Sequence, residues 1–220
     1  MKRLVIFDLD GTLLNTVADI AAATNHALAA NGYPTHSVDA IRSFVGNGIN
    51  KLFERALPEG HKDEAEVLRI RASFVPYYNE HGAERTVPYP GIPELLTALQ
   101  AHGLKLAVAS NKYQEATLGL VAHFFPSIRF EAVLGQRREV PSKPNPRIVE
   151  EICALSGTER PDVLYVGDSG VDMETAANAC VEVVGVTWGC RPRTELERYH
   201  PDWLVDRADE ILPIALQQRN

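Results

Sequence analysis

The sequence has little cysteine, with only Cys153, Cys180 and Cys190 among 220 residues and no C-x-x-C pair. Three unpaired thiols argue against a disulfide framework and favour reduced residues that pack in the interior. The seven histidines show no H-x-x-x-H spacing. Neither residue type therefore predicts a zinc site.

Long hydrophobic runs are also missing. Residues 1–7 begin like a signal peptide, but Asp8 ends the apolar run well short of the core that an export signal needs. No stretch approaches the roughly 20 apolar residues that span a bilayer. We therefore expect a cytoplasmic protein that does not enter a membrane.

Positive charge is scarce and scattered along the chain. The 22 Lys and Arg residues face 29 Asp and Glu residues, a formal net charge of -7, which argues against binding to nucleic acid or to an anionic membrane. The 45% hydrophobic and 23% charged residues are typical of a globular domain. The expected partner is a small molecule, and either a monomer or a weak homodimer fits this composition.

What is present is a repeated strand and helix pattern. A continuous apolar run at residues 4–7 predicts a buried strand. From residue 88 onward helical periodicity, including a helix predicted at 112–123, alternates with further apolar runs, at 104–109, 130–134, 163–166 and 181–186. Repeated strand–helix units predict an α/β fold, a doubly wound parallel sheet with helices on both faces.

The stretch between the first two strands contains only helical patterns. These predict helices from residue 17 to a stop at Gly32, and then at 38–45, 49–57 and 63–81. Thr16 and Asp19 suit a capping box at the first of them. We predict a small all-helical cap domain at 15–85, inserted into a core domain made of 1–14 and 86–220.

Polar and acidic residues follow the predicted strands, where the carboxyl ends of a parallel sheet form its ligand site. A lysine at the start of a later helix joins this set. The candidates are Asp8, Asp10, Ser110, Asn111, Lys143, Asp168 and Asp172. Carboxylates that converge at one edge repel one another unless a cation lies among them. A donor set of oxygens alone points to a hard ion such as Mg²⁺.

A Mg²⁺ site beside a lysine and a hydroxyl suits a phosphate dianion, which we expect Asp8, Ser110, Asn111 and Lys143 to bind. Asp8, ionised at neutral pH, can attack phosphorus. Asp10 lies two residues further on, on the same face of an extended strand end, and can move protons if its pKa is raised. The pattern predicts phosphoryl transfer.

These residues resemble, in order and spacing, the four motifs of the haloacid dehalogenase superfamily. The motifs are Asp8-Leu9-Asp10-Gly11-Thr12, Ser110, Lys143-Pro144 and Gly167-Asp168 with Asp172. The resemblance implies that Asp8 forms an aspartyl phosphate, that Asp10 is the general acid and base, and that Ser110 and Lys143 bind the phosphoryl oxygens. It also implies that Mg²⁺ is held by the Asp8 side chain, the Asp10 carbonyl and Asp168, with Asp172 behind them.

The helical insertion resembles the C1 cap of that superfamily. Residues 44–48, 54–57 and 185–189 are similar to its phosphoglycolate phosphatases, which implies a Mg²⁺-dependent phosphatase acting on a small phosphorylated carboxylate such as 2-phosphoglycolate. Such a carboxylate needs a cation or amide donors. The cap offers Arg42, Gly46, Asn47, Gly48 and Lys51 close together in sequence.

Two other functions remain open from the residues. A phosphosugar mutase of the same superfamily, such as β-phosphoglucomutase, shares almost all of the candidate residues. A phospho-receiver module of a signalling relay also combines an acidic pair, a hydroxyl and a lysine. Receivers are about half as long and have no helical cap, so the sequence favours an enzyme.

Overall fold

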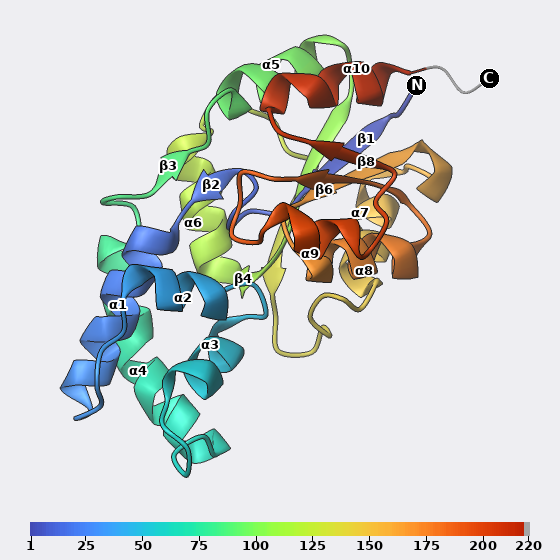
Figure 1. Ribbon diagram of the computed structural model, residues 1–220. Helices are drawn as coiled ribbons and strands as arrows, with labels where there is room; N and C mark the ends of the chain where they lie inside the picture. Colours follow the sequence, from blue (N-terminus) through green and yellow to red (C-terminus); the bar gives the residue numbers. More distant parts are fainter. Residues whose placement is uncertain (218–220) are drawn as a thin grey trace.

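The computed structural model describes residues 1–217, so the last three residues of the predicted core segment lie outside it (Figure 1). Its main sheet contains six parallel strands in the order β5-β4-β1-β6-β7-β8. The strands are β1 (Leu4–Phe7), β4 (Lys105–Tyr113), β5 (Ala132–Gln136), β6 (Val163–Gly167), β7 (Glu182–Val186) and β8 (Trp203–Val205). The predicted doubly wound α/β fold is confirmed.

Helices cover both faces of this sheet (Figure 1). They are α5 (Ile92–Ala101), α6 (Gln114–Phe124), α7 (Arg147–Ser156), α8 (Gly170–Ala179), α9 (Arg193–Glu197) and α10 (Ile211–Leu216), with short 3-10 turns η1 (Arg160–Asp162) and η2 (Ala208–Glu210). Alternate residues of β1 point to opposite faces. Val5 and Phe7 pack with α5, α6 and α10, whereas Leu4 and Ile6 pack with α7, α8 and α9. Burial on both faces explains why the strand is apolar throughout.

The helical insertion has a core of its own. It contains α1 (Val17–Ala30), α2 (Val38–Phe44), α3 (Ile49–Ala56) and α4 (Glu64–His81), all within the predicted segment 15–85. The rings of Phe53 and Phe74 meet edge to face at its centre, beside Ile70. A short antiparallel pair, β2 (Leu14–Asn15) with β3 (Val87–Pro88), closes the two connections to the main sheet. The insertion lies at one end of the sheet as a separate helical layer (Figure 1).

The carboxylate of Asp19, in the first turn of α1, joins the two connections. It accepts hydrogen bonds from the backbone amides of Arg85 and Thr86, at 2.9 and 2.8 Å, and from the Thr86 hydroxyl at 2.8 Å. The predicted capping box is therefore wrong. Thr16 makes no cap bond, because its backbone is helical (φ -99°, ψ -4°) and not extended as in a capping residue, and its hydroxyl donates to the side chain of Asp10 at 2.7 Å.

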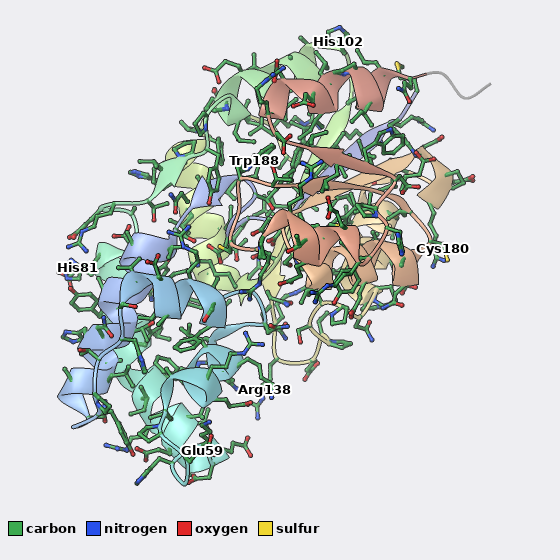
Figure 2. The ribbon with its side chains drawn as sticks, viewed as in Figure 1. Glu59, His81, His102, Arg138, Cys180 and Trp188 are labelled. Carbon is green, nitrogen blue, oxygen red and sulfur yellow. The ribbon has the colours of Figure 1, made fainter. Side chains whose placement is uncertain are left out.

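Two further details differ from the sequence-based expectation. The second strand of the core continues past Ala109 to Tyr113, with a break in register between these residues, so Lys112 is extended and does not begin a helix. All three cysteines are free thiols, but Cys180 is exposed at the end of α8 and is not a packing residue (Figure 2). None of the helices in residues 1–217 is long and apolar enough to cross a membrane.

Replacement of Asp19 by Ala tests the link between the two connections. Asp19→Ala leaves the amides of Arg85 and Thr86 without this acceptor, while the Thr86 hydroxyl keeps the Gly82 carbonyl at 3.0 Å, so we expect the free energy of unfolding to fall by about 2–4 kcal/mol. Urea unfolding measures this change. Asp39→Ala is the matched control, since the Asp39 side chain is 92% exposed. Equal stability of the two variants would contradict this role.

Candidate active site

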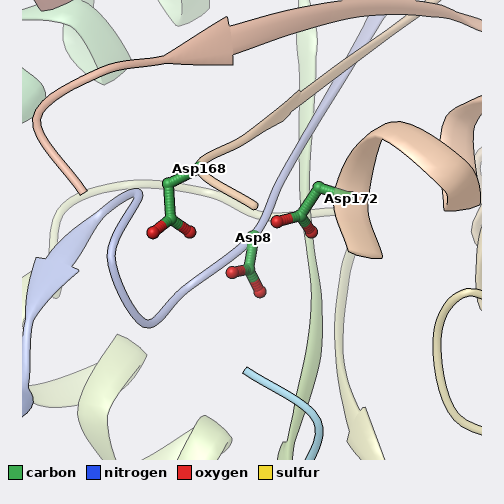
Figure 3. A group of neighbouring side chains, drawn as sticks. All are labelled: Asp8, Asp168 and Asp172. Atoms are coloured by element: carbon green, nitrogen blue, oxygen red, sulfur yellow. The ribbon is translucent and has the colours of Figure 1, made fainter. Parts of the chain in front are cut away.

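Three buried carboxylates meet at the carboxyl end of the sheet (Figure 3). Asp8 follows the central strand β1, Asp168 follows the neighbouring strand β6, and Asp172 comes from the first turn of α8. Each offers one oxygen, and these oxygens all lie within 4.8 Å of one another. The topology thus brings together residues that are 160 positions apart, because the ends of adjacent parallel strands share one edge.

The ammonium group of Lys143 lies inside this cluster. Its Nζ donates to Asp8 Oδ1 at 2.8 Å and to Asp172 Oδ1 at 2.7 Å. It also contacts the Ala109 carbonyl at 2.9 Å and the Tyr165 hydroxyl at 3.1 Å. The structure therefore unites Lys143 with the aspartates that the sequence grouped with it.

Asn111 holds the backbone of Lys143 in place. Its side-chain oxygen accepts from the Lys143 amide at 2.9 Å, and its amide group donates to the Lys143 carbonyl at 3.2 Å. The same amide group donates to the carbonyl of Gly46 in the cap at 3.1 Å. Asn111 thus contacts both Lys143 and the cap, and it positions the backbone of Lys143.

Burial and mutual repulsion shift the protonation of this cluster. Burial raises the pKa of Asp8, opposed by Lys143 and assisted by Asp172 and Asp168. Burial, followed by repulsion from Asp172, raises the pKa of Asp168 to about 7. Burial alone would lower the pKa of Lys143, but the carboxylates of Asp172 and Asp8 hold it above its ordinary value. Lys143 therefore remains a cation.

The cluster fits a divalent cation. Three carboxylates against the single ammonium of Lys143 leave two negative charges when all are ionised. Asp172 uses both oxygens in the protein, since Oδ1 accepts from Lys143 and Tyr165 while Oδ2 accepts from the amide and hydroxyl of Ser169. Asp8 and Asp168 accept fewer hydrogen bonds from the protein than Asp172 does. Oxygen donors alone match a hard ion.

Two glycines make room for Asp168. A Cβ at Gly11 would lie 2.2 Å from Asp168 Oδ2, and a Cβ at Gly189 would lie 2.3 Å from the Asp168 side chain. Neither separation is sterically possible. The backbone amide of Cys190 donates to Asp168 Oδ2 at 2.6 Å, which orients the carboxylate. Any residue larger than glycine at position 11 or 189 would therefore displace the Asp168 side chain.

Asp10 faces a partner that the sequence reasoning missed. Both of its oxygens lie 3.0 Å from Lys112 Nζ, and Oδ1 also accepts from Thr16. The Lys112 ammonium lies 4.6 Å from the centre of the Tyr78 ring. The sequence pattern predicts that Lys112 begins a helix. In the structure it lies at the carboxyl end of β4, where residues of the ligand site are expected.

A pocket separates this edge of the sheet from the cap. Its core side contains Asp8, Asp10, Ser110, Asn111, Lys112 and Tyr113, and its cap side contains Ile20, Val45, Gly46, Gly48, Ile49, Leu52, Phe74 and Tyr78. It encloses about 510 Å³, the open mouth included. Gly48, at φ +84°, places its Cα so close that a Cβ would lie 3.3 Å from the Asn111 carbonyl. A glycine here lets the cap loop approach the catalytic edge.

The structure divides the predicted cap residues into two groups. Gly46 and Gly48 line the pocket, whereas Arg42, Asn47 and Lys51 do not. Asn47 accepts from Arg55, Lys51 pairs with Glu54, and Arg42 lies 3.8 Å from Asp39. Direct substrate contacts of these three residues stay predictions.

Arg191 is a second residue that the sequence did not single out. Its guanidinium donates to the carbonyls of Ser43 and Val45 at the end of α2, at 3.1 and 2.6 Å. The preceding residue, Cys190, holds Asp168. One short segment of the core therefore contacts both the carboxylate cluster and the cap.

Comparison with known proteins defines the class of this fold and site. The sequence profile of the haloacid dehalogenase-like hydrolases matches residues 5–186. The chain belongs to this family, and it is a hydrolase similar to the family's phosphoglycolate phosphatases.

The similarity extends over the whole chain. The phosphoglycolate phosphatase of Mesorhizobium japonicum is 33% identical over 220 residues, covering 99% of this chain and 96% of that protein. The phosphoglycolate phosphatase of Haemophilus influenzae is 34% identical over 218 residues, covering 96% and 97%. A crystal structure from Lactobacillus delbrueckii subsp. bulgaricus has a TM-score of 0.92 and 33% identity, and it covers 99% of this chain and 100% of that one.

The raised pKa of Asp168 predicts how stability varies with pH in a chelator. Because its folded-state pKa of about 7 exceeds its ordinary value of 3.8, the folded state binds more protons between these values. The free energy of unfolding should therefore fall as the pH rises from 4 to 7. Urea unfolding across this range measures the slope. Asp168→Asn should make the slope shallower, and an unchanged slope in that variant would contradict the assignment.

Proposed function

We propose that the protein is a Mg²⁺-dependent phosphomonoester hydrolase that works through an aspartyl phosphate on Asp8. The observation that carries the proposal is the Lys143 ammonium between Asp8 and Asp172, at the edge of a pocket that the cap covers. A fixed cation beside a carboxylate nucleophile suits the charge of a phosphoryl group.

The proposed reaction has two steps. The Asp8 carboxylate attacks phosphorus, the bond from phosphorus to the ester oxygen breaks, and Asp10 supplies a proton to the departing alcohol. Asp10 then takes a proton from water as the water attacks the phosphorus of the acyl phosphate. The Asp8 carboxylate leaves, and inorganic phosphate is released. Lys143 and Ser110 bind the phosphoryl oxygens throughout.

The Asp8 side chain, Asp168 and the Asp10 carbonyl would hold Mg²⁺, with Asp172 behind them. The ion would offset the negative charge of the phosphoryl oxygens. The oxygen-only donor set and the two uncompensated charges of the cluster support this ion. Asp172 is committed to Lys143 and Ser169, which is consistent with an outer position.

The proposed substrate is a small phosphate ester, 2-phosphoglycolate first of all. The names of relatives that match over their full length support this choice. A phosphosugar mutase would use the same residues and return the phosphoryl group to a sugar. A receiver module is disfavoured, because it offers neither the cap nor the covered pocket. We also expect the protein to act in the cytoplasm, as a monomer or weak homodimer.

The requirement for the ion can be measured directly. Activity should vanish in EDTA and return with Mg²⁺. Asp168→Ala removes a ligand and should raise the Mg²⁺ concentration needed for half-maximal activity by about 10-fold or more. Titration of activity with Mg²⁺ gives this value, and Asp162→Ala is the control on the exposed turn before β6. Full activity in EDTA would contradict the proposal.

Phosphate release without a sugar acceptor separates a hydrolase from a mutase. We expect 2-phosphoglycolate to yield stoichiometric inorganic phosphate, and Asp8→Asn to lose turnover by about 10⁴-fold or more while keeping its fold. A phosphate-release assay with circular dichroism measures both. Rapid conversion of a hexose 1-phosphate to the 6-phosphate, with little free phosphate, would establish the mutase instead.

A further inference from the structure

The pocket beyond the phosphoryl site has mainly apolar walls. Its cap side contributes Ile20, Val45, Ile49, Leu52 and Phe74. A carboxylate that enters such a space loses water and needs charged or hydrogen-bonding partners in return. A substrate of the proposed class, with a carboxylate on its alcohol part, is therefore best bound by a cation or by hydrogen-bond donors that face the pocket.

Lys112 carries the only positive charge among the lining residues that the structure describes. Its side chain is 6% exposed and its ammonium lies against both oxygens of Asp10. An ammonium group has three N–H donors. With one donor on each Asp10 oxygen, the third can be given to a ligand in the pocket in place of the nearby Tyr78 hydroxyl.

Tyr78 is the second, independent observation. This residue of the cap helix α4 lines the pocket and is 2% exposed. Its hydroxyl makes no hydrogen bond of normal length and angle among residues 1–217, although the Lys112 ammonium lies close to it. A buried hydroxyl without a normal hydrogen bond is costly and calls for an explanation. Burial raises its pKa, so the hydroxyl keeps its proton and can donate. The Lys112 ammonium lies 4.6 Å from its ring centre.

We propose that Lys112 and Tyr78 together bind the carboxylate on the alcohol part of the substrate. Lys112 supplies a charged hydrogen bond from the core, and Tyr78 supplies a neutral one from the cap. The inference rests on the proposed phosphatase function and names its specificity residues. It assigns this task to the pair that faces the pocket, in place of Arg42 and Lys51.

Two substrates with the same skeleton test the assignment. Ethyl phosphate has a methyl group where 2-phosphoglycolate has its carboxylate, so the ratio of their kcat/KM values isolates recognition of that group. Lys112→Met should lower the ratio by about 10- to 100-fold, as expected for a lost charged hydrogen bond. Tyr78→Phe should lower it by about 2- to 10-fold. The ratio is the readout because loss of Lys112 also disturbs Asp10, which slows both substrates.

Matched controls lie on the same cap. Tyr77→Phe changes the neighbouring tyrosine of α4, whose ring stacks on His26 away from the pocket lining. Lys62→Met removes a lysine paired with Glu59. Both should keep the wild-type ratio. A ratio that falls in Lys51→Met or Arg42→Ala, but not in Lys112→Met, would overturn the inference.

A binding measurement separates this inference from the reaction. In an Asp8→Asn background, calorimetric titration should show tighter binding of 2-phosphoglycolate than of ethyl phosphate, and Tyr78→Phe should reduce that difference. Tyr78→Phe removes only one oxygen atom. If Lys112→Met fails to fold, the binding preference of Tyr78→Phe therefore tests the inference by itself. A preference retained in Tyr78→Phe and Lys112→Met overturns the inference alone. A wild-type enzyme that hydrolyses ethyl phosphate but shows no preference overturns the substrate class as well.

Discussion

Lys143 places one positive charge between two of three buried carboxylates, and the arrangement of the site follows from the balance of these charges. Without the ammonium, Asp8 and Asp172 would face each other in a dry environment and one of them would take up a proton. The ammonium lowers the pKa of Asp8, against the rise caused by burial and by the neighbouring Asp172 and Asp168. The net negative charge of the cluster favours the binding of a divalent cation. That cation and Lys143 together would offset the charge of a phosphoryl dianion.

The cap completes this site through backbone contacts. The carbonyls of Ser43 and Val45 accept hydrogen bonds from Arg191, whose neighbour Cys190 orients Asp168. The carbonyl of Gly46 accepts from Asn111, which also holds the backbone of Lys143. The loop of the cap is therefore hydrogen-bonded to the parts of the core that position Asp168 and Lys143. The cap forms one wall of the pocket and reduces the access of water to its core side.

The sequence contained enough to predict the sheet and to group Asp8, Lys143, Asp168 and Asp172, which the structure brings together. Apolar runs such as residues 4–7 reveal strands buried on both faces, and acids that follow strands must meet at one edge. Contacts between side chains that are distant in sequence could not be predicted in this way. Lys112 pairs with Asp10, which lies 102 positions away in the sequence. The Thr16 hydroxyl donates to the same Asp10 side chain and does not cap the first helix. These two contacts depend on the residues at which β4 ends and α1 begins, which the sequence pattern does not define to within one residue.

The central claim is that Asp8 carries the phosphoryl group during turnover. It is tested most directly by acid quench of the wild-type enzyme during hydrolysis of a ³²P-labelled phosphomonoester, followed by peptide mapping. The account predicts label on the amino-terminal peptide, at Asp8, with hydroxylamine releasing it as expected of an acyl phosphate. Label on another residue, or rapid turnover with no labelled protein at any time after mixing, would contradict it.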